Sequence, residues 1–197
     1  MDDVLKADLY RYHGLTGRKG FWKGLSQPGF RYTYLFREIS KCKGRSVKKK
    51  IFTWLIMHYQ FKYGFQIFPG TDIGPGLFIG HFGALGINSS TKVGKNFTIM
   101  MGVTIGQANR GKLRGTPVIG DNVWIGAHGV VVGNIRIGNN VLIAPNSYVN
   151  FDVPDNSIVI GNPGKIIPHE NPTKDYILYV LDENGNPIPE VDEYLTL

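Results

Sequence analysis

His81 and His128 are the side chains of this 197-residue sequence best suited to acid–base chemistry within its regularly patterned part. An imidazole titrates near neutral pH, so it can take a proton from a hydroxyl group and return it later. The other interpretation of His81 is a histidine at a corner of the fold that only packs or bonds a carbonyl group. A zinc site would need three converging imidazoles, and these two histidines stand 47 residues apart in the chain. We therefore expect no metal.

The only cysteine, Cys42, excludes an internal disulfide framework and a zinc site built from several cysteines. It lies outside the repeated part of the chain, and we do not expect it to be a nucleophile. The sequence also lacks an apolar segment of signal-peptide or membrane-spanning length. These features predict a protein of the reducing cytoplasm.

Positive charge is concentrated in the first third of the chain. Residues 1–64 contain 14 Lys or Arg and 4 Asp or Glu, whereas residues 65–197 contain 8 and 11. A basic arm on a weakly acidic body could meet nucleic acid, an anionic membrane or a phosphorylated ligand. No RNA- or DNA-binding motif accompanies the basic residues, so we expect no nucleic-acid partner.

An aliphatic residue returns every six positions through most of the remaining chain. With two interruptions, the series consists of Ile67, Ile73, Ile79, Leu85, Val93, Ile99, Ile105, Ile119, Ile125, Val131, Ile137, Ile143 and Val149. Each six-residue unit predicts a short strand and a corner, and three units close one triangular coil, so thirteen units predict about four coils. Glycine often follows the aliphatic residue, which we explain by corner dihedrals that a Cβ atom makes costly. A β-sandwich would instead show turns roughly every 8–12 residues.

We therefore predict a mainly β protein with a three-sided parallel prism over residues 65–167. A solenoid accepts insertions only at its corners, so the polar segment 107–116 is expected to be a corner loop. Residues 1–64 lack the repeat, and their sequence pattern predicts helices at roughly 33–42 and 46–63. The last segment, 168–197, is expected to contain a hairpin around Asn184-Gly185.

The repeats and their flanking motifs resemble the hexapeptide-repeat acyltransferases, most closely the serine acetyltransferase branch. The similarity covers about residues 65–167 and is weaker in the helical segment. The motifs that carry it are GPGLFIGHFG at 74–83, GVTIG at 102–106, IGDNVWIGAHGVVVGN at 119–134 and GNPGKII at 161–167. The resemblance implies a left-handed parallel β-helix, a homotrimer with active sites between subunits, and acetyl-CoA as co-substrate without a metal.

The resemblance also implies that His81 is the catalytic base of a direct transfer in a ternary complex. The position of the family's carboxylate, which orients this histidine, is Gln66 in the present sequence. Glutamine can accept a hydrogen bond from the imidazole but adds no charge to stabilise an imidazolium. Asp72, one segment later, is the alternative partner.

Two positions that hold serine in the family are changed. Where the family has an acidic residue just before the histidine, this sequence has Gly80. Where the family has an Arg-His pair near the end of the loop, this sequence has Gly115-Thr116. A zwitterion needs charged partners in a partly dry pocket. We therefore predict O-acetylation of a sugar or polysaccharide precursor. Serine O-acetylation in cysteine biosynthesis is the alternative, and a non-catalytic β-helix scaffold is the alternative from another class.

The family's coenzyme A contacts map onto the later coils. The matching positions are Gly106, Ala127, Pro145, Asn150 and Lys165. Trp124 either packs against the pantetheine arm or is buried in the trimer contact. Lys165 is expected to meet the phosphates, with Arg110, Lys112 and Arg114 of the loop as further candidates or as solvated charges.

The segment 48–63 is basic at its start and aromatic throughout. We interpret it first as a helix that caps one end of the β-helix and keeps its lysines in water. The second interpretation is an interfacial helix that attaches a cytoplasmic enzyme peripherally to the inner membrane surface.

Overall fold

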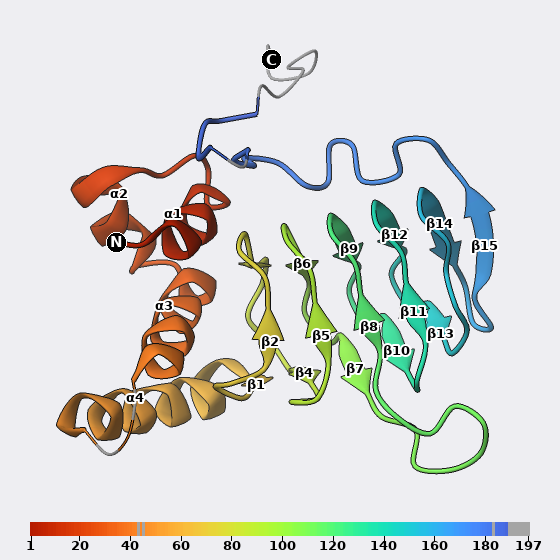
Figure 1. Cartoon of the computed structure of the whole chain (residues 1–197), viewed down its shortest axis with the longest axis horizontal. Coiled ribbons are helices and arrows are strands. Elements are labelled where there is room, and N and C mark those ends of the chain that lie inside the picture. The colour runs from red at the N-terminus through yellow and green to blue at the C-terminus, as the bar shows by residue number, and fades with distance from the viewer. Residues whose placement is uncertain (43, 45, 183, 189–197) are drawn as a thin grey trace.

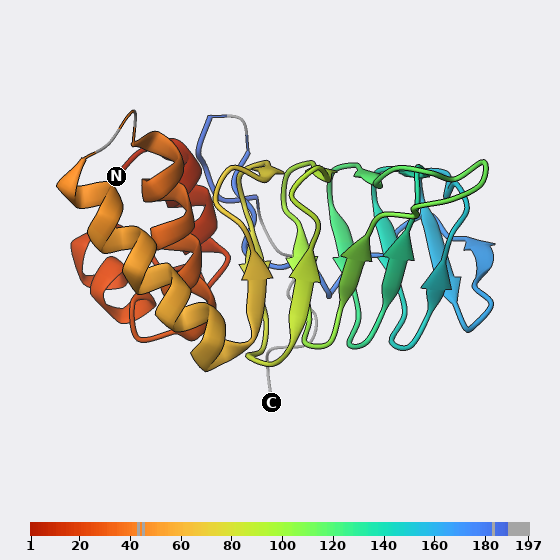
Figure 2. The ribbon, with the colours of Figure 1, turned by 90° about the horizontal axis from the view of Figure 1, so that it is seen from below.

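The computed structural model describes residues 1–42, 44, 46–182 and 184–188, and it places a layer of helices at one end of a long β-prism (Figure 1). Figure 2 shows the coils of the prism stacked side by side along its axis. Within the described residues, no helix combines the length and the apolar character needed to cross a membrane.

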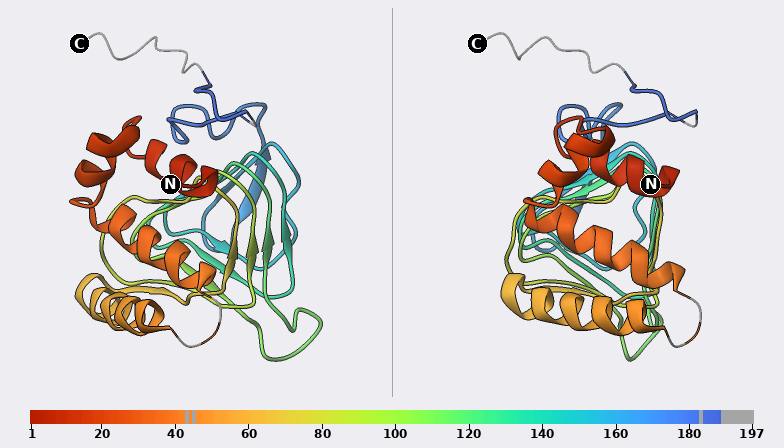
Figure 3. Two further views of the ribbon diagram at one scale, coloured as in Figure 1. Left: turned by 60° about the vertical axis from the view of Figure 1, so that its left-hand side comes forward. Right: turned by 90° about the vertical axis from the view of Figure 1, so that its left-hand side faces the viewer.

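The helical layer contains α1 (Asp3–Tyr10), α2 (Gly17–Gly24), α3 (Pro28–Lys41) and α4 (Val47–Tyr63). The sequence predicted α3 and α4 and missed α1 and α2, which have eight residues each. Asp2 and Ser46 cap α1 and α4 by accepting backbone N–H groups. The layer lies across the first coil of the prism (Figure 3).

Three parallel sheets form the three faces of the prism. The first face consists of β1 (Phe65–Ile67), β4 (Leu85–Ile87), β7 (Thr104–Gly106), β10 (Val130–Val132) and β13 (Tyr148–Val149). The second face consists of β2 (Asp72–Ile73), β5 (Lys92–Val93), β8 (Val118–Ile119) and β11 (Arg136–Ile137). The third face consists of β3 (Phe78–Ile79), β6 (Thr98–Ile99), β9 (Val123–Ile125), β12 (Val141–Ile143) and β14 (Ser157–Ile160), followed by the antiparallel β15 (Lys165–Pro168).

The aliphatic residues of the six-residue series form ladders inside the prism. On the second face, for example, Ile73, Val93 and Ile119 lie in register on neighbouring strands, and all three are buried. On the third face Ile79, Ile99 and Ile125 do the same. The predicted parallel prism is therefore confirmed.

The prism has about five coils, so the prediction of about four was wrong by one. The fifth coil contains β13, a bridge from Val153 to Ile137 on the second face, and β14. Its second-face residue Val153 comes only four positions after Val149, the last member of the series. This shortened spacing hides the coil from a search for a strict six-residue period.

The glycines that follow the aliphatic residues are needed for a different reason from the one predicted. Gly74, Gly94, Gly120 and Gly138 do not have positive φ angles. They form a column in which a Cβ atom on each of the first three would lie 2.7 Å from backbone atoms of the next glycine. Close approach of coils therefore excludes a side chain here.

The positive φ angles at the same corner belong to Gly76 in the first coil and to asparagines in the later coils. Asn96, Asn122, Asn140 and Asn156 have φ angles of 52–54°. Asparagine tolerates this left-handed conformation better than most residues. Its amides also join the coils: Asn96 donates to Asn122 at 2.9 Å, and Asn140 donates to Asn156 at 2.7 Å.

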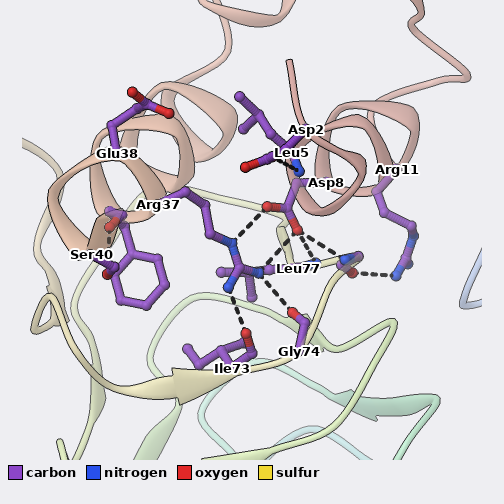
Figure 4. A network of polar contacts seen from close by, with 12 residues as sticks. Asp2, Leu5, Asp8, Arg11, Arg37, Glu38, Ser40, Ile73, Gly74 and Leu77 are labelled. Atoms are coloured by element: carbon purple, nitrogen blue, oxygen red, sulfur yellow. Dashed lines mark hydrogen bonds and ion pairs between the residues drawn. The ribbon is translucent and has the colours of Figure 1, made fainter. Parts of the chain in front are cut away.

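A buried polar network fixes the helices to the first coil (Figure 4). The carboxylate of Asp8 on α1 accepts from Nε of Arg37 on α3 at 2.8 Å and from the backbone N–H groups of Gly76 and Leu77 at 2.9 and 2.8 Å. Arg37 also donates to the carbonyl oxygens of Ile73 and Gly74. Burial raises the pKa of Asp8, while Arg37 and the two N–H groups act in the opposite direction. Because α1 and α3 both bind this coil, the position of the helical layer is specified.

The C-terminal segment returns along the third face to the helices (Figure 1). It contacts α1 through the carbonyl oxygen of Leu178, which accepts from Nε of Arg11 at 2.8 Å. Within the described residues, the predicted hairpin is limited to one antiparallel bridge between Leu181 and Pro187. The remainder of that prediction lies outside the described residues.

Candidate active site

His81 begins a column of residues along the edge between the third and first faces, which we call the histidine edge. His81, Met101, Ala127 and Pro145 each come two positions after the inward residue of the third face. Backbone hydrogen bonds between the preceding residues, such as that from the Gly80 N–H to the Ile99 carbonyl oxygen at 3.0 Å, keep these coils in register. Since coils are about 4.8 Å apart, the column is about 14 Å long.

The His81 side chain is exposed, and its neighbour Phe82 is 67% exposed. Among the described residues, the imidazole has no hydrogen-bond or ion-pair partner. An imidazole at an open edge can approach a bound substrate from either ring nitrogen. This position agrees with a base and does not agree with a histidine that is bonded into the fold.

The two candidate partners of His81 lie on different faces. Gln66 is the outward-facing middle residue of β1 on the first face, opposite Gly86 of β4, and this face borders the histidine edge. Asp72 is on β2 of the second face, which does not border that edge. In the described structure no hydrogen bond joins either side chain to His81. The fold therefore favours Gln66 over Asp72 within one chain.

The atoms nearest to a Cβ atom built on Gly80 or Gly115, apart from those of the chain neighbours, belong to uncharged side chains and backbone. A Cβ atom on Gly80 would lie 2.5 Å from Sδ of Met100, so the thioether occupies the space a side chain would enter. Gly115 has a φ angle of +136°, and a Cβ atom there would lie 2.9 Å from Cβ of Asn134. Both positions are closed to larger side chains without rearrangement of a neighbour.

The predicted coenzyme A residues are divided between two edges and one face of the prism. Ala127 and Pro145 belong to the histidine edge. Gly106 and Asn150 follow inward residues of the first face and lie near the edge between the first and second faces, which we call the loop edge. Lys165 is an exposed residue of β15 on the third face. A single chain does not bring these five residues together.

Trp124 lies under the C-terminal segment of its own chain. Its indole ring packs against Tyr176, with ring centroids 4.9 Å apart, and is 9% exposed. A cavity of about 660 Å³ adjoins this pair and extends to Pro145, the fourth residue of the column on the histidine edge. The cavity therefore continues the column that begins at His81.

Two polar residues of this cavity, His169 and Lys174, were not predicted as site residues. Both lie in the segment that follows the last repeat, where no periodicity indicates which face of the prism the chain will cross. Only the antiparallel turn from β14 to β15 directs this segment back over the third face. The cation of Lys174 suits an anionic group of a ligand that follows the column, although the carboxylate of Asp175 lines the same cavity.

Between β7 and β8 the chain forms a loop that closes on itself through bridges between Ala108 and residues Arg114 and Gly115. It projects from the loop edge (Figure 1). The side chains of Arg110, Lys112 and Arg114 are exposed, and no ion pair connects them to another described residue. They belong to the loop edge and not to the histidine edge of the same chain.

Among the described residues, no three His, Cys, Asp or Glu side chains are grouped as metal ligands would be. The ring of His128 packs beside Gly102, where a Cβ atom would collide with it. His128 is itself exposed at the histidine edge, on the coil that follows Met101.

Comparison with known proteins gives the same fold and a group of related sequences. Residues 116–150 match the family model described as bacterial transferase hexapeptide (six repeats). The serine acetyltransferase of Staphylococcus aureus (strain Mu50) is 42% identical over 111 residues, which are 56% of this chain and 52% of that protein. The chain thus matches about half the length of this relative.

Two crystal structures of Neisseria gonorrhoeae serine acetyltransferase resemble the chain closely. One has a TM-score of 0.69 at 30% identity and aligns with 85% of this chain and 64% of its own. The structure in complex with serine has a TM-score of 0.67 at 31% identity and aligns with 83% of this chain and 67% of its own. These matches confirm the predicted left-handed parallel β-helix.

Proposed function

The chain belongs to the hexapeptide-repeat acetyltransferases of the serine acetyltransferase branch, and we propose that it transfers an acetyl group from acetyl-CoA to a hydroxyl group, with His81 as general base. The observation that carries this proposal is the exposed imidazole at the start of the histidine edge. It stands at one end of a column that leads into the cavity beside Trp124 and Lys174.

In this reaction His81 takes the proton of the acceptor hydroxyl as its oxygen attacks the thioester carbonyl. A C–O bond forms and the C–S bond breaks, and the proton passes from His81 to the leaving thiolate. Gln66 is the positioning residue for the imidazole. Because glutamine is neutral, it orients the ring without stabilising its charged form. Backbone N–H groups of the glycine-rich corner are suited to the negative charge on the carbonyl oxygen.

The coenzyme would lie along the histidine edge with its thioester beside His81 and its phosphates toward the last coils. The column is exposed at Met101 and Pro145 and partly exposed at Ala127, so it can accept an extended pantetheine arm, and the cavity offers Lys174 as a cation for a phosphate. Lys165 on β15 is a further candidate for the same role. These residues fit the chemistry of the ligand.

The division of predicted residues between two edges supports a homotrimer. Gly106 and Asn150 near the loop edge cannot line a groove together with Ala127 at the histidine edge of the same chain. They can do so if the loop edge of one copy lies against the histidine edge of the next. In that arrangement the loop cations Arg110, Lys112 and Arg114 would also reach the neighbouring site.

Serine is the acceptor that the relatives support. The Staphylococcus aureus protein and both Neisseria gonorrhoeae structures carry the name serine acetyltransferase, and one of those structures is a complex with serine. The test is release of coenzyme A thiol from acetyl-CoA with L-serine. Turnover by the wild-type protein that collapses in His81→Ala supports the proposal, and no turnover with serine removes this acceptor.

A sugar hydroxyl is the second candidate acceptor, and the contacts of Gly80 favour it. A zwitterionic amino acid needs charged partners, whereas position 80 is a glycine beside the apolar thioether of Met100, and residues 115–116 are Gly-Thr. Thiol release should then be measured across sugars, nucleotide sugars and amino acids. In the Met100→Gln variant, a changed KM for the acceptor at an unchanged KM for acetyl-CoA would support a role of this contact in acceptor choice.

Binding of the coenzyme separates both enzymatic proposals from the scaffold alternative. Calorimetric titration with coenzyme A should show binding by the wild-type chain and by His81→Ala, since the histidine acts on the acceptor. A chain that gives no heat with coenzyme A and no thiol release with any acceptor would be a scaffold.

A further inference from the structure

Helix α4 has apolar side chains on two opposite sides. One side packs on the core through Ile56 and the partly buried Phe52, Leu55, Tyr59 and Tyr63. The other side, which we call the outer stripe, consists of exposed residues three or four positions apart: Val47, Ile51, Trp54, Met57 and Phe61. At about 100° per residue, this second series faces away from the first.

The outer stripe is unusually exposed for its composition. Phe61 is 86% exposed, Val47 is 73% exposed and Trp54 is 67% exposed. A helix at the surface of a globular protein normally turns polar residues toward water on this side. A contiguous exposed apolar stripe instead indicates contact with a partner or a membrane. No described residue of the chain packs over it.

The charges around the stripe select the kind of partner. Helix α4 contains Lys48, Lys49, Lys50 and Lys62 and no acidic residue. Lys48 is paired with Glu38 at 2.6 Å, whereas Lys49, Lys50 and Lys62 have no ion pair among the described residues. A second copy docked through the same stripe would bring two basic arms together, which repulsion between like charges disfavours. A membrane surface with anionic lipids offers negative charge for the lysines and an apolar interior for the side chains of the stripe.

We propose that the outer stripe binds an anionic phospholipid surface, with α4 lying along that surface. Trp54 and Phe61 would enter the boundary between headgroups and acyl chains, and the lysines would meet lipid phosphates. Figure 3 shows α4 along one edge of the helical layer, below α3. This attachment does not depend on which hydroxyl is acetylated.

Sedimentation of the whole chain with lipid vesicles tests the proposal. One set of vesicles is phosphatidylcholine alone, and the other is an equimolar mixture of phosphatidylcholine and phosphatidylglycerol. We expect binding to the mixed vesicles that high salt weakens. The double variants Trp54→Ser/Phe61→Ser and Lys50→Glu/Lys62→Glu should each weaken that binding by on the order of tenfold or more.

The matched control is Trp22→Ser. Trp22 on α2 is 64% exposed, and α2 lies at the opposite side of the helical layer from α4 (Figure 1). This variant should bind the mixed vesicles as the wild type does. Equal binding to both vesicle types, or full binding by Trp54→Ser/Phe61→Ser, would overturn the proposal. It also fails if that double variant abolishes a self-association seen without lipid, because the stripe is then a contact between copies.

Discussion

Gly94 lies directly against the backbone of Gly120 on the next coil, and a Cβ atom on Gly94 would be 2.7 Å from the carbonyl carbon and oxygen of Gly120. Gly86 occupies the equivalent sequence position after an aliphatic residue on the first face. A Cβ atom there would meet only Cβ of Gln66, at 3.9 Å. The same sequence signal thus marks one glycine that the packing requires and one that it does not.

Gly94→Ala should therefore destabilise the protein by about 1–3 kcal/mol, because the added methyl group forces two coils apart. Gly86→Ala should leave stability within about 0.5 kcal/mol of the wild type. Chemical denaturation of both variants gives the two free energies of unfolding. Equal losses in the two variants would mean that coil spacing does not explain the glycine column.

His81→Ala should lower kcat by about 10²–10⁴-fold while the affinity for coenzyme A stays near that of the wild type. Gln66→Ala should cause a smaller loss, because the neutral side chain only orients the imidazole. Thiol-release kinetics measures the loss of activity in both variants, and calorimetric titration measures the affinity for coenzyme A. The division of roles is rejected if the two variants lose activity equally.

Asp8→Asn should destabilise the protein by about 3 kcal/mol, because it leaves the buried guanidinium of Arg37 without a countercharge. The matched control is Asp3→Asn on the same helix. Asp3 pairs with Lys6 at 2.9 Å, but its side chain is 97% exposed, so no measurable change is expected. Thermal and chemical unfolding of the two variants compares them directly. A loss of the same size in both variants would contradict the role of burial.

Glu38 should make stability depend on pH at the acid end. Burial acts to raise the pKa of Glu38, but hydrogen bonds from Lys41 and Lys48 outweigh it and hold the pKa below its ordinary value. The stabilisation is therefore present above the unfolded pKa of about 4.3 and is lost as pH falls through the lower folded value. At neutral pH the free energy of unfolding of the wild type should exceed that of Glu38→Gln by less than about 1 kcal/mol.

The same two proteins should be equally stable once the pH lies below the folded pKa of Glu38. Free energies of unfolding measured from neutral pH to about pH 3 follow this convergence. A difference that stays constant over the whole range would show that the ion pairs of Glu38 with Lys41 and Lys48 are not its cause.

The six-residue spacing of the aliphatic residues predicted the prism, the corner loop and the position of His81 at a corner. Such a pattern is local: each short strand needs one inward side chain, and the next corner follows at a fixed distance. The two longer helices could be predicted for the same reason. The fifth coil was missed where Val149 and Val153 shorten the spacing.

Only the tertiary structure decided which distant residues share an edge or a face. The stacking of coils placed His81, Ala127 and Pro145 on one edge and Gly106 on another, and it explained the glycine column by close approach instead of by backbone dihedrals. The return of the C-terminal segment covered Trp124 with Tyr176. These relationships depend on contacts between segments far apart in the chain, which a local pattern does not contain.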